Sequence, residues 1–407
     1  MAPAAWPGPS RRIGGRTMPN IPPQDHAVPH VSTIPANRNE HVDLFVREYD
    51  GTRPHHDPEA VLMLHGRSVP ALAGFDLQHG RYSWAQDLAQ AGYDVFVMDL
   101  QGSGLSPRPE MDNPCNANPA QQNAALVPNP LVAACPPAYP KQLGNSQSEW
   151  DELDTVVEFI RKSRNVPQVA FVGWSAASFV MGPYVLQHPS KVSSLLFLAP
   201  IFPPRGNASK AGTRFDAPHP LPLSTPASQF GFPMNLTMKA DLTRVWDVEL
   251  KCPDQRENGM VDVVWSAIMD NDAIGKTWGP VHSGVPEGVL RFRNSFWWGW
   301  NDTTVPFDQT LGTVVPVLLI YGESDTQANH PSTDPRTDFS VPALYAAIPG
   351  ADKLMIEVAC AGHQMPWESR VEDLHHMARE WFKHTAVDGL KSGSYALDAN
   401  GNYTALP

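Results

Sequence analysis

A serine, an aspartate and a histidine in this sequence stand where they could act together. Ser175, Asp325 and His363 each follow a short apolar segment typical of a buried strand. A serine hydroxyl becomes an effective nucleophile when a histidine removes its proton and an acidic group orients that histidine. Because the carboxyl ends of parallel strands converge on one crevice, we expect the three side chains to meet there. The sequence thus predicts that Ser175 attacks a carbonyl carbon, with His363 as base and Asp325 as its partner.

The segment Gly173–Ala177, with the sequence GWSAA, provides the local context of the serine. It lies directly after an apolar run and directly before an expected helix, as a nucleophile elbow does. Such a turn projects the hydroxyl away from the backbone, and small residues two positions to either side let strand and helix pack closely. The pattern is G-x-S-x-A rather than G-x-S-x-G, a departure of one methyl group. An ordinary helix-capping serine is the alternative interpretation.

Two backbone amides are candidates for stabilising the negative charge that develops on the substrate oxygen. They belong to Arg67, just after a His-Gly turn, and to Ala176, just after the serine. His65, in that turn, is expected to brace it structurally. Glu323, two residues before the predicted acid, is an alternative to it. The segment 193–199 is followed by Pro-Ile, so the other usual position for the acid is vacant.

The segment 98–106 superficially resembles a dinucleotide-binding loop. Its Gly-Ser-Gly lacks a third glycine, and Pro107 and Pro109 preclude the phosphate-binding helix. The cysteines and histidines show no spacing typical of a zinc site. The sequence therefore predicts neither a nicotinamide cofactor nor a metal ion.

Short apolar runs alternate with amphipathic segments, which is typical of a mostly parallel sheet covered by helices on both faces. Ser148 is the expected N-cap of one helix, and Asn400-Gly401 indicates a small hairpin in the tail. We expect strands at 42–49, 60–64, 94–100, 168–173, 193–199, 314–321 and 353–358, and helices at 82–91, 149–164, 176–188, 341–348 and 371–384.

The composition restricts the class of protein. The chain has 407 residues, 42% of them apolar, and a net charge of −12. This supplies a large core and opposes nucleic-acid binding, and no apolar run reaches the roughly 18 residues of a membrane-spanning helix. The first residues lack the apolar stretch of a signal peptide, which favours the cytoplasm, or the periplasm or secretion if the N-terminus is processed. A small-molecule substrate is the expected partner, and nothing indicates the oligomeric state.

Proline-rich interruptions divide the chain, because proline disfavours helix interiors and central strands. We expect an N-terminal proline-rich arm, an α/β core in two parts, one insert within its first part, a tryptophan-rich segment between the parts, and a tail. Their ranges are 1–40 for the arm, 41–200 and 313–385 for the core, 105–147 for the insert, 201–312 for the tryptophan-rich segment and 386–407 for the tail.

Taken together, the motifs resemble the α/β-hydrolase superfamily over roughly residues 42–384, apart from the two long inserts. They are the His-Gly turn, D-L-Q-G-S-G-L-S, G-W-S-A-A, G-E-S-D and A-G-H-Q-M-P-W-E. The resemblance implies the same triad and places a cap over the active site in residues 201–312. A serine at the elbow separates the chain from haloalkane dehalogenases and epoxide hydrolases, whose nucleophile is an aspartate.

We therefore expect a serine hydrolase of carboxylic esters or lactones that works through an acyl-enzyme on Ser175. Amide or C–C bond hydrolysis by the same triad, and a non-catalytic ligand-binding protein of this fold, are the alternatives. The tryptophan-rich cap favours a bulky apolar or aromatic substrate, although these rings could instead form the core of the cap. The side chains expected to line the substrate pocket are Trp174, Trp297, Trp298 and Trp300.

The four cysteines are too few for a disulfide scaffold. Cys115 and Cys135, 20 residues apart in a proline-rich insert, are candidates for a disulfide that staples this loop, or for free thiols in a cytoplasmic protein. Cys252 and Cys360 are expected to be isolated residues, with Cys360 filling space in the core.

Overall fold

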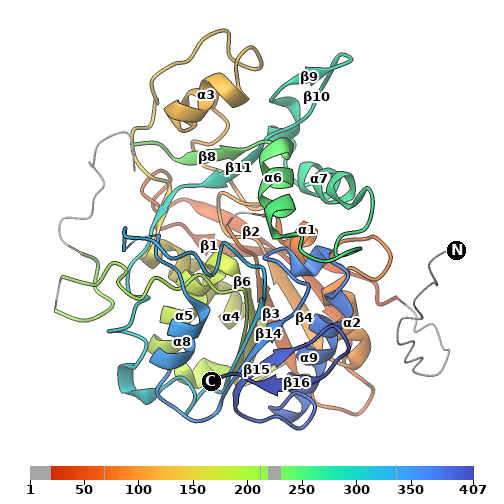
Figure 1. Cartoon of the computed structure of the whole chain (residues 1–407). Coiled ribbons are helices and arrows are strands. Elements are labelled where there is room, and N and C mark those ends of the chain that lie inside the picture. The colour runs from red at the N-terminus through yellow and green to blue at the C-terminus, as the bar shows by residue number, and fades with distance from the viewer. Residues whose placement is uncertain (1–19, 68, 211, 219–230, 336) are drawn as a thin grey trace, which may run out of the picture.

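The computed structural model describes residues 20–67, 69–210, 212–218, 231–335 and 337–407. Within them, ten strands form one sheet in the order β1-β2-β4-β3-β6-β7-β13-β14-β15-β16 (Figure 1). The strands are β1 (Gln24–Val31), β2 (His41–Asp50), β3 (Ala60–Leu64), β4 (Asp94–Met98), β6 (Val169–Trp174), β7 (Val192–Leu198), β13 (Val317–Gly322), β14 (Lys353–Val358), β15 (Gly393–Leu397) and β16 (Tyr403–Ala405).

The centre of this sheet is parallel and its outer strands are antiparallel. β3, β4, β6 and β13 are buried along their whole length, as expected for continuous apolar runs that are covered on both faces. β2 runs antiparallel to β4, β1 to β2, and β16 to β15. The predicted mostly parallel α/β architecture is confirmed, and β15 and β16 form the hairpin expected around Asn400-Gly401.

Helices cover both faces of the sheet (Figure 1). α2 and α9 pack against each other, as do α4 and α5. None of the described helices is long and apolar enough to cross a membrane. The helices outside the two inserts are α1 (Ala71–Phe75), α2 (Trp84–Ala91), α4 (Ser146–Arg164), α5 (Ser178–Gln187), α8 (Val341–Ala347) and α9 (Val371–His384).

The start of α4 differs from the prediction. Ser148 was expected as its N-cap, but Asn145 holds that position, and its side chain accepts the backbone N–H of Ser148 at 3.1 Å. The Ser148 hydroxyl in turn accepts the backbone N–H of Asn145 at 3.1 Å. The two residues form a capping box that satisfies two otherwise orphan donors, so the helix begins one turn earlier than its apolar periodicity suggests.

Part of the predicted proline-rich arm belongs to the sheet. Gln24–Val31 pairs with β2 along its whole length as the edge strand β1, and Val28 and His30 are buried. Pro29 is compatible with this role because an edge strand has one side without a ladder partner. Residues 1–19 of the arm lie outside the described residues.

The two inserts form one joint layer. The first contains α3 (Pro119–Ala125) and β5 (Gly144–Asn145). The second contains β8 (Met234–Thr237), α6 (Lys239–Glu249), α7 (Met260–Asp270), β9 (Val281–His282), β10 (Val285–Pro286), β11 (Leu290–Arg293) and β12 (Ser295–Phe296). β5 of the first insert pairs with β12 of the second, and β8 pairs with β11. A shared hydrophobic cluster includes Met111, Leu126 and Leu143 from the first insert and Met234, Leu236 and Val289 from the second.

We predict that Asn145→Ala lowers the free energy of unfolding by about 1 kcal/mol, because the backbone N–H of Ser148 loses its side-chain acceptor. Urea denaturation followed by circular dichroism measures the change. The control is Gln147→Ala, an exposed position two residues later that takes no part in the box. An equal loss of stability in both variants would contradict the assigned role of Asn145.

Candidate active site

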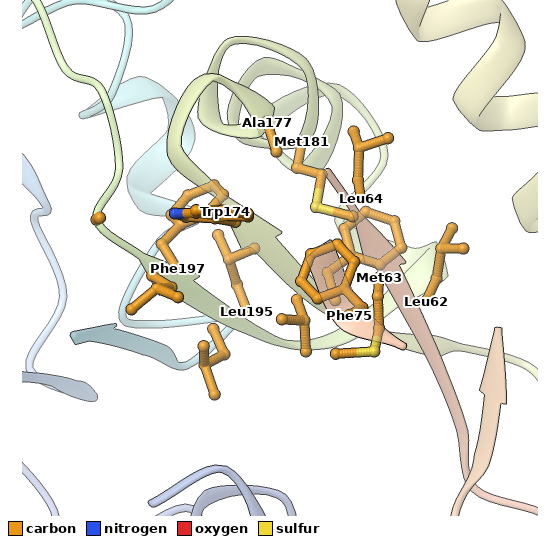
Figure 2. Packing of buried hydrophobic residues seen from close by; sticks show 14 of the residues in the cluster. Leu62, Met63, Leu64, Phe75, Trp174, Ala177, Met181, Leu195 and Phe197 are labelled. Carbon is orange, nitrogen blue, oxygen red and sulfur yellow. The ribbon is translucent and has the colours of Figure 1, made fainter. Parts of the chain in front are cut away.

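Ser175 occupies a sharp turn between β6 and α5. Its backbone has φ of 58°, in the left-handed region that non-glycine residues seldom adopt. Gly173 is required here, since a Cβ atom would lie 2.8 Å from Cε1 of Phe197 and 3.1 Å from Sδ of Met181 (Figure 2). Ala177, the departure from the usual motif, is buried in this packing without displacing the turn. The local geometry is therefore that of an elbow rather than of a capping serine.

The three residues singled out in the sequence lie within hydrogen-bonding distance of one another. Oγ of Ser175 is 2.8 Å from Nε2 of His363. Nδ1 of the same imidazole is 3.0 Å and 3.1 Å from the two carboxylate oxygens of Asp325. With Nδ1 donating to the carboxylate, Nε2 is left as an acceptor for the serine proton.

The loop after β13 holds the Asp325 carboxylate in place. Its Oδ1 accepts the backbone N–H groups of Gln327 at 2.9 Å and Ala328 at 2.8 Å. Glu323, the alternative acid, is exposed and makes no described side-chain contact with His363. The structure therefore places Asp325, and not Glu323, against the imidazole.

The His-Gly turn after β3 approaches the serine from the other side. A Cβ atom on Gly66 would lie 3.1 Å from Cβ and 3.7 Å from Oγ of Ser175, so the backbone leading to Arg67 runs directly past the hydroxyl. The buried His65 ring bonds to the Gly66 carbonyl at 2.5 Å. Burial and the charge of Arg293 lower the pKa of His65 to about 3, so the ring is neutral and braces the turn.

The glycine-rich segment after β4 is wrapped around a buried aspartate rather than open to a phosphate. Asp99 accepts the backbone N–H of Ala71 at 2.8 Å and that of Leu105 at 2.9 Å. Gly104 is needed because a Cβ there would lie 1.9 Å from the Asp99 carboxylate. Among the residues that the structure describes, no three His, Cys, Asp or Glu side chains are grouped to hold a metal ion.

Two buried glutamates surround the His363 loop, and sequence reasoning did not identify either of them. Glu249, the last residue of α6, accepts the backbone N–H of His363 at 2.8 Å and both the N–H and the hydroxyl of Thr326. Glu368 accepts the N–H of Gly362 at 2.8 Å and the indole N–H of Trp246 at 2.8 Å. One carboxylate from the second insert thus connects the acid loop with the base loop. Nothing in the local sequence around Glu249 indicates this role.

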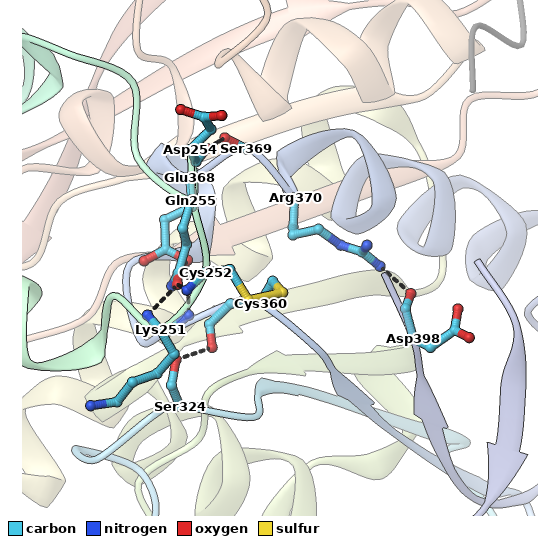
Figure 3. The surroundings of a disulfide bond; sticks show 12 residues. Lys251, Cys252, Asp254, Gln255, Ser324, Cys360, Glu368, Ser369, Arg370 and Asp398 are labelled. Carbon is cyan, nitrogen blue, oxygen red and sulfur yellow. Dashed lines mark hydrogen bonds between the residues drawn. A yellow bond between two sulfur atoms is a disulfide. The ribbon is translucent and has the colours of Figure 1, made fainter. Parts of the chain in front are cut away.

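A disulfide between Cys252 and Cys360 adds a covalent link between the second insert and the loop of His363 (Figure 3). Cys252 follows α6, and Cys360 lies three residues before His363. The expectation that these cysteines are isolated was wrong, because residues 108 positions apart in the chain become neighbours only once the insert folds back. Close to the bond, the Ser324 hydroxyl donates to the Glu249 carbonyl at 2.6 Å. Cys115 and Cys135 form a second disulfide, within the first insert.

The charges around His363 act on its proton affinity. Burial alone would lower the pKa of the imidazole, but the negative charges of Asp325, Glu249 and Glu368 outweigh this and raise its pKa above the usual 6.5. Burial raises the pKa of the Glu368 carboxyl to about 7 in spite of its three N–H donors. The surrounding carboxylates therefore stabilise the protonated form of this imidazole relative to that of an isolated histidine.

A cavity of about 430 Å³ lies over Ser175 and His363. The core contributes Trp174 and Trp367 to its walls. The joint layer of the inserts contributes further apolar surface, from Leu236, Leu242, Val245, Leu290 and Phe292. The cavity is thus mostly apolar away from the serine, and both inserts border it, since Gln121 of the first insert also lies in the wall.

Three of the four predicted pocket tryptophans do not line this cavity. Trp174 does, but Trp297, Trp298 and Trp300 border a separate, smaller hollow. Trp297 stacks on Phe179 with ring centroids 4.6 Å apart, and Trp298 and Trp300 are almost fully buried. Their indole N–H groups donate to Glu149, to the Phe215 carbonyl and to the Ile201 carbonyl respectively. The prediction was wrong because these rings fix the second insert to α4 and α5, which is the packing alternative.

Comparison with known proteins adds independent information. A sequence model of the family described as alpha/beta hydrolase fold matches residues 59–369. No curated protein matches the chain. A serine hydrolase from the polyaromatic-hydrocarbon-degrading bacterium Cycloclasticus zankles is similar in structure, with TM-score 0.46, 14% identity and coverage of 89% of this chain and 98% of that one.

Two esterases show a comparable degree of similarity. For a thermophilic esterase from Thermogutta terrifontis the TM-score is 0.42 and the identity 15%, covering 88% of this chain and 98% of that chain. For the naproxen esterase of Bacillus subtilis the TM-score is 0.43 and the identity 12%, covering 89% and 92%.

We predict that Glu249→Gln lowers the pKa of His363, because a negative charge that favours the imidazolium is removed, while the amide oxygen replaces only one of the two carboxylate oxygens that accept hydrogen bonds. NMR titration of the ring, assigned with a His363→Asn variant, measures the shift. Glu323→Gln is the matched control: it removes an exposed charge from the neighbouring loop and should leave the titration unchanged. An unchanged midpoint in Glu249→Gln would show that this carboxylate does not act on the imidazole.

Proposed function

This chain belongs to the alpha/beta hydrolase family, and from that premise we propose that it is a serine hydrolase acting on carboxylic esters or lactones of small molecules. The observation that carries the proposal is the series of hydrogen bonds from Ser175 through His363 to Asp325 at the base of a cavity. This is the arrangement that turns a serine hydroxyl into a nucleophile.

In the proposed reaction, Nε2 of His363 takes the proton of the Ser175 hydroxyl as Oγ attacks the carbonyl carbon. Asp325 keeps the proton on Nδ1 and stabilises the imidazolium that forms. The backbone amides of Arg67 and Ala176 would receive the oxyanion, since one follows the Gly66 turn and the other the serine itself. His363 then returns the proton to the leaving alcohol. In the second half, water attacks the acyl-enzyme with His363 again as base.

The two inserts together are proposed to act as the cap of this site. Support comes from the cavity walls, which draw on β8, α6 and β11 of the second insert and on Gln121 of the first. The apolar surface of Leu236, Leu290 and Phe292 favours a substrate with a bulky apolar part, at about 25 cal/mol per Å² of area removed from water. In this proposal Trp174 contributes to binding, whereas the other three tryptophans are structural.

The two disulfides are informative about the cellular compartment in which the protein works. Disulfides persist where the environment is oxidising and are rare in the cytosol. We infer that the protein works in an oxidising compartment, in place of the cytoplasm expected from the first residues. Alkylation and mass spectrometry of the protein from its native cells would test this, since four alkylated cysteines would overturn the inference.

We predict that Ser175→Ala lowers kcat for p-nitrophenyl esters by roughly 10⁴–10⁶-fold while the protein remains folded. The measurement is a series of such esters with increasing acyl length, with circular dichroism as the check on folding. In the wild type, a fluorophosphonate should add to Ser175 alone, as read by mass spectrometry of peptides. An adduct on a different serine, with activity lost in parallel, would refute the assignment.

Asp325→Asn is expected to lower kcat by about 10³–10⁴-fold with little change in KM, because it disturbs the tautomer of His363 rather than substrate binding. Glu323→Gln is the control and should stay near wild-type activity. In the wild type, kcat/KM should fall as the pH drops through the raised pKa of His363, since the base must be neutral to act. If Glu323→Gln loses activity and Asp325→Asn does not, the acid of the triad is Glu323 and not Asp325.

A further inference from the structure

The cavity over Ser175 contains a positive charge without a counter-ion. The Arg67 side chain lies in the cavity wall, directly after the Gly66 turn that runs past the serine. No ion pair or hydrogen bond joins its guanidinium to any residue in the described part of the chain. Its one described contact is the face of Phe292, whose ring centroid lies 4.6 Å from Cζ. A guanidinium has five N–H donors, and a ring face satisfies none of them in the plane of the fork.

The other charged groups of the cavity are already engaged. Asp241, the acidic side chain in the wall, pairs with Arg244 at 3.3 Å near the mouth, where the Arg244 side chain is 70% exposed. The Gln364 side chain lies in the wall beside His363, and its Oε1 has no described partner, but it can only accept a hydrogen bond. Arg67 is therefore the place in this cavity where an anion would be bound.

The surroundings of Arg67 leave its charge accessible to a ligand, because the residue is exposed and lies in the cavity wall. Desolvation by neighbouring protein atoms, together with the charge of Arg293, lowers the pKa of Arg67 to about 10, although the residue is exposed. The group remains charged at neutral pH. Arg293 itself is buried and bonded to Glu149 at 2.8 Å, so that carboxylate is already paired with another arginine. A charge held in this way is stabilised when an anion pairs with it, and the planar fork of arginine matches a carboxylate or phosphate in two-pronged fashion.

We propose that Arg67 is the specificity-determining residue of the active site, and that it binds an anionic group of the substrate a short distance from the bond to be cleaved. The inference rests on the proposed hydrolase function and narrows it. The preferred substrate carries an acid group at one end, an ester or lactone carbonyl at Ser175, and an apolar part against Leu236 and Leu290. The backbone amide of Arg67 and its side chain then serve two different oxygens of one substrate.

The kinetic test compares two esters of the same length. One is mono-p-nitrophenyl adipate, with a free carboxylate, and the other is its methyl ester, which is neutral. We expect the wild type to prefer the anionic ester in kcat/KM, and Arg67→Met to lower the ratio of the two values by about 10- to 100-fold, the range for losing a charged hydrogen bond. Arg67→Lys keeps the charge but not the fork and should retain an intermediate ratio. Raising the salt concentration should lower the wild-type ratio.

The control is Arg244→Met, which removes an arginine from the mouth of the same cavity. Since the Arg244 side chain is 70% exposed and its charge is screened by solvent, the ratio should change by less than about threefold. If Arg67→Met slows both esters equally, or if the wild type shows no preference, Arg67 only shapes the turn and the proposal is overturned. The ratio is informative even if the Arg67 variants change the overall rate.

A binding measurement separates this proposal from the hydrolase function. The Ser175→Ala variant is titrated calorimetrically with 4-phenylbutyrate, with the neutral 4-phenylbutanamide and with phenyl phosphate. Tighter binding of an anion than of the amide, lost on adding Arg67→Met, supports the anion site even if no ester is hydrolysed. The comparison of 4-phenylbutyrate with phenyl phosphate shows which acid group the site accepts. Equal binding of acid and amide would overturn the proposal whatever the activity of the enzyme.

Discussion

The left-handed backbone of Ser175 is the constraint on which the rest of the site depends. A non-glycine residue in this region costs on the order of 1–3 kcal/mol, so its surroundings must hold it there. β6 supplies a fixed start, because it lies between β3 and β7 in the middle of the sheet. The Ser178 hydroxyl then bonds to the carbonyls of both Ser175 and Ile201, at 2.9 Å and 2.7 Å. The lack of a side chain at two glycines matters as much, because Cβ atoms on Gly66 and Gly173 would fill the space that the turn needs.

The serine is positioned by the sheet, but the histidine is positioned by an insert. In the loop that carries His363, the backbone N–H of His363 donates to Glu249, and Cys360 is bonded to Cys252. Glu249 is the last residue of α6, and Cys252 follows that helix. The same Glu249 carboxylate also binds Thr326 in the loop of Asp325. A change in the position of α6 would therefore act on the geometry of the acid and the base as well as on the walls of the cavity. Substrate binding and base positioning are coupled through one helix.

The cavity itself results from two inserts that fold together. β5 with β12 and α3 with β8 join segments more than 100 residues apart, and a common cluster around Met234 and Leu236 fills the space between them. Both inserts contribute residues to this cluster, and the Cys115–Cys135 bond further restricts the first insert. The tryptophans of the second insert fasten this layer to α4 and α5, which leaves Phe292 and Leu290 to face the serine. The same layer places Phe292 of the second insert against Arg67 of the core.

The sequence by itself determined the sheet, most of the helices and the strand ends that carry Ser175, Asp325 and His363, because these depend on local apolar periodicity and on short motifs. It also indicated the Gly66 turn and excluded a phosphate loop at 98–106, since glycine and proline act locally. Proline content obscured the edge strand β1, where an edge position tolerates Pro29. The tertiary structure alone decided the role of Glu249, the Cys252–Cys360 bond, the joint layer of the inserts and the position of Arg67, which forms no ion pair with the described residues. Each of these is a contact between residues far apart in the chain, and burial and pairing of that kind arise only when the whole chain has folded.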